Sequence, residues 1–432
     1  MSWTLSRCIS LFPVKLSLER DAHDIVCERI HNDIMVDVQF PYSNGVYLAG
    51  AIITFVTSGL SIFGSSSILY LIASRSRRAA KRRKSNQQQQ QVQRSSSIAT
   101  CHDQNATVRQ SAYLRFVLGL SISDLLFSGA IFWQPIAMPS STGLPLASGN
   151  VQSCETVGFL MALGSASFFY SSGLSVYFYL TIRNDGKDTG GILTRIEWIV
   201  LSVALVFSMS AALISLTTDN INPAPIGFCA IAPYPFGCQG NDCLRGSMQT
   251  SRAILLPGVC LMFLVAAIGL VCTWLVYWKV RQKLHQTRRF TFTSELEDSH
   301  HRRIRTVAVQ AIFYSLAFVN TLVGMVLIIV SFMTHALGIS FVIWIILPLQ
   351  GFFNFFIFVR PQVLHLQKQY PEQSLLWAYK RIFTTASSPS SIRGSSQLKS
   401  SASSVHAAGK SNDAFDAAEG GGSRLQDDTL EC

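Results

Sequence analysis

The amino-acid sequence predicts an all-α membrane protein, a bundle of seven transmembrane helices with the N-terminus outside and the C-terminus in the cytoplasm. The 432-residue chain is 49% hydrophobic and only 14% charged, which is too apolar for an ordinary soluble protein. A hydropathy window of about 19 residues finds seven stretches long enough to cross a bilayer. The predicted spans cover residues 46–73, 114–138, 156–182, 196–217, 252–279, 304–332 and 338–359.

The distribution of Lys and Arg predicts the orientation of these spans. Of the 35 basic residues, 29 fall in the C-terminal tail and in the loops after the first, third and fifth spans. Loops rich in Lys and Arg stay in the cytoplasm, so the N-terminus is expected outside. Most of the net charge of +11 then lies in cytoplasmic loops next to anionic lipid, so binding to the membrane surface explains it better than binding to nucleic acid. We expect a multi-pass protein of the plasma membrane, with another endomembrane as the alternative.

Polar segments flank the transmembrane domain, which we place at residues 46–360. Residues 1–45 form a short extracellular segment, too short for a ligand-binding domain of its own. Residues 74–113 are basic and then rich in Gln and Ser, which predicts a long disordered first cytoplasmic loop. Residues 361–383 carry apolar positions at helical spacing, which predicts an amphipathic juxtamembrane helix. Residues 384–432 are rich in Ser and Gly, as expected for a disordered cytoplasmic tail.

The predicted spans lack the residues that several other seven-helix classes need. All nine histidines fall outside the predicted spans. A seven-helix metal hydrolase needs metal ligands such as His inside the bundle, so we expect neither that activity nor a bound catalytic metal. The sixth and seventh spans contain no Lys, which excludes a retinal Schiff base there. Asp124 is the one ionisable residue near a span centre, whereas ion-coupled transport usually needs several. We expect a protein that is not an enzyme, with a transporter-like or non-signalling seven-span protein as the alternative.

Asp124 is expected at the centre of a polar switch network. It lies about ten residues into the second span, hence ~15 Å deep, where a carboxylate costs at least ~2.5 kcal/mol and needs partners. Gln350 in the seventh span has a similar depth, and Asn354 lies one turn below it on the same helical face. Ser171 and Ser172 of the third span fall at this level. The alternative is that these polar groups only hold the helices together.

The seventh span, "LPLQGFFNFFIFVRP", contains a predicted kink and a predicted close contact. Pro348 removes one backbone hydrogen bond, which bends a helix. Gly351 permits the close approach of a neighbouring backbone, and Gly64 of the first span lies at the same level. We interpret this span as a movable helix whose hinge contacts are the two amides, and we expect Arg360 and Pro361 to end it.

Six cysteines lie on the predicted outer face, an oxidising environment in which disulfides form. Two of them, Cys8 and Cys27, are in the N-terminal segment and could pair with each other. Cys154 marks the outer end of the third span, and Cys229, Cys238 and Cys243 lie in the second outer loop. These last four cysteines allow three pairings, and the sequence does not fix the connectivity. We favour Cys154 with Cys229, because that bridge would cap the bundle, and Cys238 with Cys243 as a local loop.

These features resemble the G-protein-coupled receptors. "SISDLLF" in the second span is similar to a motif of rhodopsin-like receptors, and that resemblance implies a sodium ion near Asp124. Across the transmembrane domain the sequence is more similar to the slime-mould cyclic-AMP-receptor group. The matching stretches are "LGSASFFYSSGLSVYFYLTI" in the third span and "LQGFFNFFIF" before Pro361 in the seventh. The resemblance covers about residues 45–384. It implies no other cofactor, and it implies coupling to a heterotrimeric G protein.

The chain also departs from the rhodopsin-like pattern. At the inner end of the third span it has "TIRND", in which no acid precedes Arg183. No Pro follows Asn354, and the sixth span lacks the Trp-x-Pro sequence of those receptors. The ligand class is therefore not transferable from that group. Apart from Arg252, the first residue of the fifth span, no basic residue lies in the outer half of any span, which argues against an anionic ligand such as a cyclic nucleotide.

Candidate contact residues lie at both ends of the bundle. A small extracellular ligand needs a concave, mostly apolar site with a few polar anchors, and Asn320 is the strongest polar candidate. The ligand-site candidates are Trp133, Phe168, Phe169, Tyr170, Asn320 and Trp344. The candidates for contact with the G protein are Arg183, Lys279, Arg281, Arg303 and Arg305, which also fit plain cytoplasmic flanks. Phosphorylation of the Ser-rich tail would engage a kinase and an arrestin-like protein.

Overall fold

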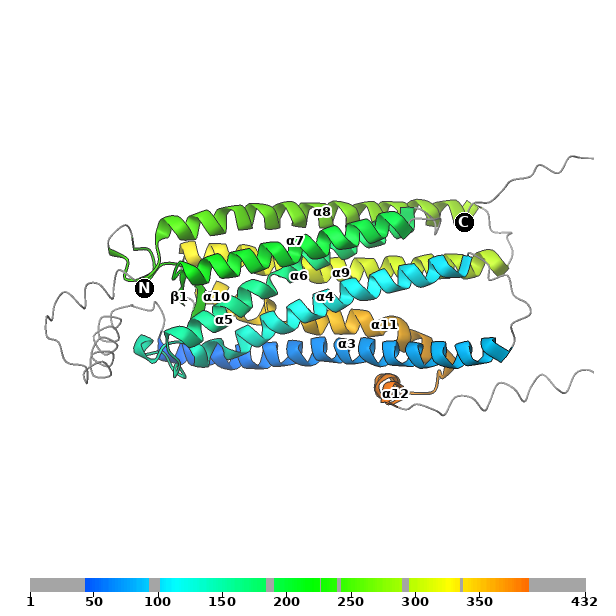
Figure 1. Ribbon diagram of the computed structural model, residues 1–432, viewed down its shortest axis with the longest axis horizontal. Helices are drawn as coiled ribbons and strands as arrows, with labels where there is room; N and C mark the ends of the chain where they lie inside the picture. The colour runs from blue at the N-terminus through cyan, green and yellow to red at the C-terminus, as the bar shows by residue number, and fades with distance from the viewer. Residues whose placement is uncertain are drawn as a thin grey trace, which may run out of the picture.

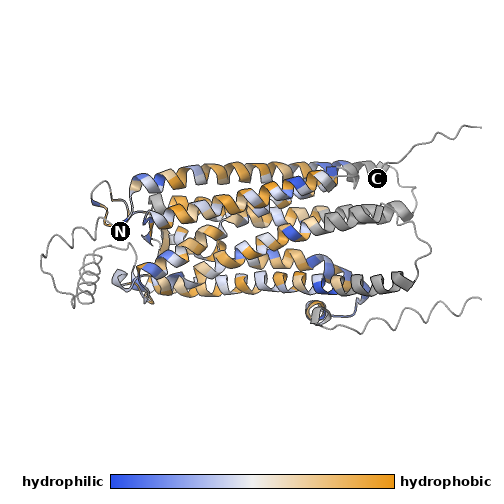
Figure 2. Cartoon of the chain, viewed as in Figure 1, coloured by the Kyte–Doolittle hydropathy of each residue, from blue (hydrophilic) through white to orange (hydrophobic). Residues whose placement is uncertain are grey.

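The computed structural model describes residues 43–92, 102–183, 190–225, 227–238, 242–289, 295–334 and 337–387. Its helices run lengthwise in one bundle with a small two-stranded hairpin at one end (Figure 1). Within these residues, seven helical segments are long and apolar enough to cross a membrane, as the sequence predicts. Hydrophobic residues line the middle of the bundle and hydrophilic residues gather at its two ends (Figure 2).

The first two membrane helices are longer than predicted. Helix α3 spans Asn44–Val92 and helix α4 spans His102–Ala137, so helix occupies most of the segment 74–113 that we expected to be disordered. Residues 74–92 contain no Gly or Pro and are rich in Arg, Lys and Gln. These residues have high helix propensity, which extends a helix already formed in the membrane.

The third to sixth spans also begin or end beyond their predicted limits. The third is built from α5 (Val151–Gly164) and α6 (Ala166–Arg183), joined at Ser165, whose hydroxyl bonds the Ala162 carbonyl. A capping box between Asn150 and Ser153 begins α5. The fourth to sixth spans are α7 (Gly190–Thr217), α8 (Met248–Arg289) and α9 (Glu295–Thr334).

The seventh span is divided into α10 (Leu337–Ile346) and α11 (Gln350–Gln369). Residues 347–349 form the break, where the sequence predicts a kink at Pro348. The expectation that Arg360 and Pro361 end the helix is wrong, since α11 continues to Gln369. A proline inside a helix removes one backbone bond, and here good helix formers follow it before Pro371.

A last helix, α12 (Leu375–Ser387), crosses α3 and α11 at the side of the bundle (Figure 1). It covers the second half of the segment 361–383 that we predicted as an amphipathic helix, while the first half belongs to α11. Ala378 and Ile382 of α12 are buried against Ile68 and Phe355. The apolar face of α12 therefore packs on the bundle.

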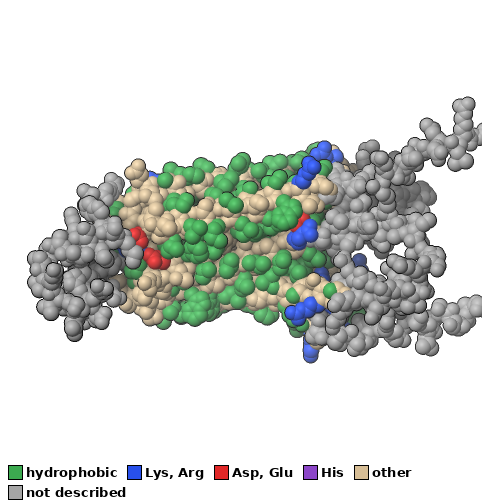
Figure 3. Space-filling view, in the orientation of Figure 1, with side chains coloured by type: hydrophobic (Ala, Val, Ile, Leu, Met, Phe, Trp, Pro, Cys, Tyr) green, Lys and Arg blue, Asp and Glu red, His purple; other side chains and the backbone are tan. Residues whose placement is uncertain are grey.

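The two ends of the bundle differ in their chemistry. At one end, strand β1 (Ile221–Ala224) pairs antiparallel with β2 (Phe228–Ile231), and the short helix η2 (Ser140–Thr142) lies in the neighbouring loop. We call this the disulfide end, because it holds the bridge between Cys154 and Cys229. Lys and Arg gather at the opposite end, which we call the basic end (Figure 3).

Burial distinguishes the central helices from the peripheral ones. In the most hydrophobic window of the third span 67% of residues are buried, and in that of the seventh 61%, against 11% in the fifth. The third and seventh spans are therefore the core of the bundle. The exposed apolar residues of α7 and α8 are free to face lipid.

Candidate functional site

The predicted polar residues of the second and seventh spans meet in the interior. The Asn354 amide on α11 donates a hydrogen bond of 2.7 Å to the Asp124 carboxylate on α4. Both side chains are buried, and 230 positions separate them in the sequence. Hydrogen bonds to a charged group are the stronger kind, so this contact ties α4 to α11 at mid-membrane depth.

Of the two predicted serines of the third span, the structure brings one to this site. Gln350 donates to the Ser171 hydroxyl at 3.5 Å, which links α11 to α6. Ser172 points away from the cluster and donates to the backbone carbonyl of Val265 on α8. Adjacent residues on a helix project about 100° apart, so both serines could not face the same neighbour.

Two serines that the sequence analysis did not single out hold the break in the seventh span. The Gly351 N–H has no partner within its own helix, and it donates to the Ser61 hydroxyl of α3 at 3.0 Å. Ser128 of α4 donates to Ser61 at 2.8 Å and to the Pro348 carbonyl at 3.5 Å. The first turn of α11 is thus capped by a neighbouring helix, because Leu349 provides no side-chain cap.

The predicted close approach of glycines is present. A Cβ atom at Gly64 would lie 2.7 Å from the Gly351 carbonyl oxygen and 2.9 Å from the Phe352 Cα. Only glycine fits at such a distance, so α3 and α11 touch backbone to backbone. The sequence contained a signal for the polar face of α3 that contacts α11. Along α3, small polar residues recur every three or four positions and so share one face: Thr54, Ser58, Ser61 and Ser65, all buried.

Two buried hydroxyl groups close to this cluster lack hydrogen-bond partners. They belong to Ser121, one helical turn from Asp124 on α4, and to Ser65, whose oxygen lies next to Gly351. With the Asp124 carboxylate they supply oxygen ligands of the kind that hard cations prefer. In the part of the chain that the structure describes, no three His, Cys, Asp or Glu residues group as a transition-metal site would require.

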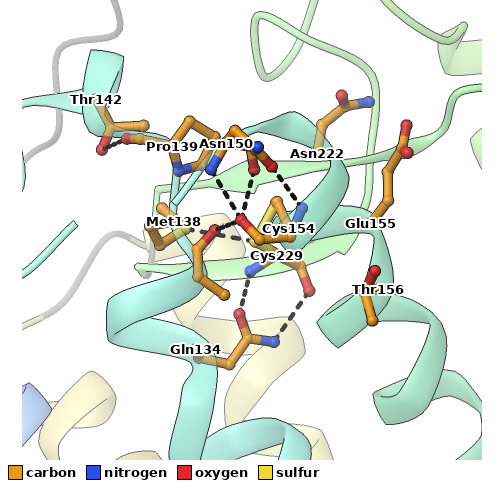
Figure 4. Close-up of a disulfide and its surroundings, with 12 residues drawn as sticks. Gln134, Met138, Pro139, Thr142, Asn150, Cys154, Glu155, Thr156, Asn222 and Cys229 are labelled. Atoms are coloured by element: carbon orange, nitrogen blue, oxygen red, sulfur yellow. Dashed lines mark hydrogen bonds between the residues drawn. A yellow bond between two sulfur atoms is a disulfide. The ribbon is translucent and has the colours of Figure 1, made fainter. Parts of the chain in front are cut away.

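At the disulfide end, both favoured cysteine pairings are confirmed: Cys154 bonds to Cys229, and Cys238 to Cys243. Gln134 of α4, buried and missed by the sequence analysis, binds both backbone groups of Cys229 (Figure 4). Its carbonyl accepts from the Cys229 N–H at 2.7 Å, and its amide donates to the Cys229 carbonyl at 3.4 Å. The hairpin is thus fixed to α5 by a covalent bond and to α4 by two hydrogen bonds.

The loop that follows the hairpin is fixed by charge and by a buried ring. Arg245 forms ion pairs with Glu155 of α5 and with Asp219, the second at 3.2 Å. The Tyr234 N–H donates to the Arg245 carbonyl at 2.8 Å, and the Tyr234 ring is almost fully buried. Burial raises the pKa of the Tyr234 phenol to about 12.

The six ligand-site candidates do not converge on one place. A cavity of about 20 Å³, room for about one water molecule, lies beneath the hairpin, and only Trp344 of the six lines it, with Tyr47, Gly50 and Phe228. Trp133 is 54% exposed on the outside of the bundle. Three of the others pack against different neighbours: Phe168 against Phe318, Phe169 against Phe207, and Tyr170 against Gly119. The amide nitrogen of Asn320 is buried and has no hydrogen-bond partner among the described residues.

The basic end holds the partner candidates that the structure describes. Arg183, Lys279 and Arg281 are exposed there. Arg303 and Arg305 belong to α9, in a stretch whose side chains lie outside the described residues. The sequence analysis missed a two-point ion pair between Arg115 of α4 and the buried Glu197 of α7. The position of Glu197 in the sequence could not reveal which basic residue faces it.

No family model matches this chain, and no curated protein sequence matches it. Among solved structures, the crystal structure of squid rhodopsin is similar over 80% of this chain and 87% of its own. The sequence identity is 13% and the TM-score is 0.45. The function is therefore inferred from the geometry of the chain's own residues.

Proposed function

We propose that this protein is a G-protein-coupled receptor, which binds an extracellular ligand at the disulfide end and acts on a heterotrimeric G protein at the basic end. The observation that carries the proposal is the buried bond between Asp124 and Asn354, next to the break at residues 347–349. A simple membrane anchor gains nothing from a carboxylate that costs at least ~2.5 kcal/mol at this depth. A bundle that changes conformation does gain from it, because such a contact can be exchanged for another.

The orientation in the proposal follows from charge. Lys and Arg gather at the basic end, and the positive-inside rule places that end in the cytoplasm. The disulfide end then faces the oxidising exterior, where its two bridges persist. The plasma membrane is the compartment that fits an extracellular ligand.

The cavity beneath the hairpin is our proposed point of ligand entry. None of its lining side chains is charged, which favours an uncharged ligand over an anionic one. Because the cavity holds only about one water molecule, a ligand must displace a side chain, and the Trp344 ring is the largest that lines it. Trp344 lies on α10, three residues before the break, so its displacement would move α10 relative to α11.

A sodium ion at Asp124 is a further part of the proposal. The Asp124 carboxylate and the unpartnered hydroxyls of Ser121 and Ser65 would hold it. Its binding would favour the conformation that supplies these oxygens. We expect NaCl to raise the thermal stability of the purified wild-type protein above that in N-methylglucamine chloride, and Asp124→Asn to abolish the difference. An equal effect of both salts on the wild-type protein would exclude the ion.

The remaining partners are proposed on composition. A kinase and an arrestin-like protein would act on the Ser-rich tail, residues 384–432, most of which lies outside the described residues. Membrane lipid contacts the exposed apolar faces of α7 and α8.

The test of the proposed function is basal guanine-nucleotide exchange on a panel of G proteins in vesicles with and without the receptor. We expect the wild-type protein to accelerate exchange on at least one of them. Asp124→Asn should raise that basal exchange about tenfold or more, because it weakens a charge-assisted bond worth about 1.5–3 kcal/mol. Ser210→Ala on the exposed face of α7 is the matched control and should match the wild type.

Two results would count against the proposal. Unchanged exchange in a correctly folded Asp124→Asn variant would leave the polar cluster with a purely structural role. No exchange on any G protein, together with solute uptake by the same vesicles, would favour the transporter-like alternative.

A further inference from the structure

We infer that an acidic segment, residues 411–432, docks on a basic segment of its own chain, residues 75–84. The basic segment is the part of α3 that continues past the predicted first span, and the acidic segment lies outside the described residues. Docking would turn the Ser-rich stretch that follows α12 into a loop held at both ends. The contact does not rest on the proposed function, because it needs neither a ligand nor a G protein.

The basic segment carries the densest positive charge in the sequence. Seven of its ten residues are Lys or Arg, and none is Asp or Glu. Because the segment lies within the continuous helix α3, residues three and four positions apart are neighbours. Positions 77, 81 and 84 therefore place like charges on one face of the helix. Like-charged neighbours destabilise a helix, so an anionic partner would stabilise this part of α3.

Helix α12 extends this positive surface at the point where the tail begins. Residues of α12 and α3 share one buried apolar cluster, so the two helices are packed together. Lys380 and Arg381 of α12 and Arg77 of α3 are exposed. None of the three forms an ion pair with another described residue. Lys and Arg side chains are visible at this corner of the bundle, around α12 (Figure 3).

The acidic segment has the opposite composition. Residues 411–432 contain six Asp or Glu and one Arg, a net charge of −5, in a chain whose net charge is +11. The linker before it, residues 388–410, contains three Lys or Arg and no Asp or Glu. The negative charge of the tail is thus confined to one block, a pattern typical of interaction tails. Its charge is complementary to that of the basic segment.

The linker is long enough for this contact to form within one molecule. Helix α12 ends at Ser387, so the 23 residues 388–410 join it to the acidic segment. Ser-rich linkers of that length span about 26 Å on average, which gives an effective concentration on the order of 1 mM. At that concentration, a contact with a Kd of about 0.1 mM is formed in about 90% of the molecules. A weak contact between charges is therefore sufficient.

Depth favours the acidic segment over anionic lipid as the partner. Helix α3 runs straight through the length of the bundle (Figure 1). Counted from Ala73, the last residue of the predicted first span, Lys81 and Lys84 lie about 12 Å and about 16 Å farther along the helix. The headgroup layer is only about 5–8 Å thick on each side of the hydrocarbon core. Lipid phosphates therefore reach the first arginines of the basic segment but not its last four residues.

The test is zero-length cross-linking of the wild-type full chain in phosphatidylcholine vesicles. A carbodiimide joins a carboxylate to a lysine amine only where the two groups are in contact, and mass spectrometry identifies the joined residues. We expect the acidic segment to cross-link to Lys81 and Lys84 at least about fivefold more than to Lys279. Lys279 is the internal control, because it is exposed on α8 at the same end of the bundle. Equal yields at the three lysines would overturn the docking.

Two matched variants separate a specific contact from a general attraction between charges. Arg82→Glu with Arg83→Glu keeps both lysines of the basic segment and reverses two charges, so the yield there should fall at least about threefold. Arg288→Glu with Arg289→Glu makes the same change at the end of α8 and should leave that yield unchanged. Equal falls in the two variants would contradict the proposal. NaCl at about 0.5 M should lower the wild-type yield without any substitution.

Two further measurements test other partners of the basic segment. The yield should persist in vesicles that contain phosphatidylserine, and its loss there would assign the segment to the membrane surface and overturn the docking. In a mixture of unlabelled and isotope-labelled protein, each cross-link should join residues of one isotope. Mixed pairs would show that the acidic segment docks on a second copy instead. Cross-linking as expected, without nucleotide exchange on any G protein, would contradict the proposed function alone.

Discussion

The disulfide end and the basic end of the bundle are held together by different kinds of contact. At the disulfide end, the bridge between Cys154 and Cys229 joins positions 75 residues apart, and Gln134 binds the same cysteine's backbone. At the basic end, α9 is held through Tyr113 and Arg360 by neutral hydrogen bonds and a cation–π contact. The first kind of contact survives a shift of helices, and the second kind can be exchanged. The contrast indicates a fixed frame at the disulfide end and a movable basic end.

The polar cluster lies between these two ends. Asp124 and Asn354 join α4 to α11 just below the break at residues 347–349. Ser61 caps the first turn of α11 from α3, so the lower half of the seventh span is anchored separately from α10. These bonds are therefore one route by which a displacement of α10 at the disulfide end can reach α11 and the basic end.

The largest effect is expected from removal of the bridge between Cys154 and Cys229. Cys154→Ser with Cys229→Ser should lower the free energy of unfolding by about 4 kcal/mol, the chain-entropy value for a loop of that length. Removal of the bridge between Cys238 and Cys243, which closes a five-residue separation, should cost only about 2 kcal/mol. Thermal inactivation in mild detergent gives the comparison. Equal losses from both pairs would mean that the disulfide end is not the fixed frame.

A slightly smaller effect is expected at the basic end, where α4 also contacts α7. Arg115→Met leaves the Glu197 carboxylate buried without its partner and should cost about 3 kcal/mol. The double variant Arg115→Met with Glu197→Leu should recover most of that loss, because no charge then remains buried. If this holds, α4 and α7 form a fixed pair at the basic end, and mobility there belongs to α9. If Arg115→Met has no effect, the whole basic end is loosely held.

Hydropathy was enough to predict the seven spans, which follow from apolar runs. Counting residues from the basic side placed Gln350 level with Asp124 and Asn354 one turn below. In the structure it is Asn354 that bonds to Asp124, while Gln350 bonds to Ser171. Ser61, Gln134 and Tyr113 were missed because their importance depends on which neighbour they face. One sequence does not contain the rotation of each helix about its axis. For the same reason Trp133 was chosen as a ligand-site candidate by its depth alone, although its ring faces the outside of the bundle.

The contact between α3 and α11 offers a test at mid-height. Gly64→Ala would place a methyl group 2.7 Å from the Gly351 carbonyl oxygen, and neither backbone can yield easily. We expect a loss of about 1–3 kcal/mol in unfolding free energy. Gly59→Ala on the same helix is the control, because its Cβ meets nothing within 4 Å, and it should be neutral or stabilising by up to about 1 kcal/mol. Equal behaviour of both variants would show that α11 is not anchored on α3.

The smallest effect concerns the disulfide end at alkaline pH. Burial raises the pKa of Tyr234 to about 12, above the value of about 10 for an exposed phenol. The folded state thus favours the neutral ring, so its stabilising contribution is complete below pH 10 and is lost as the pH rises from 10 to 12. At pH 11 the loss should be about 1.4 kcal/mol. Tyr234→Phe removes the titrating group, so its melting temperature should fall less between pH 9 and pH 11 than that of the wild type. Parallel curves for the two proteins would mean that the ring is reached by water, and that the frame around Arg245 is looser than its contacts indicate.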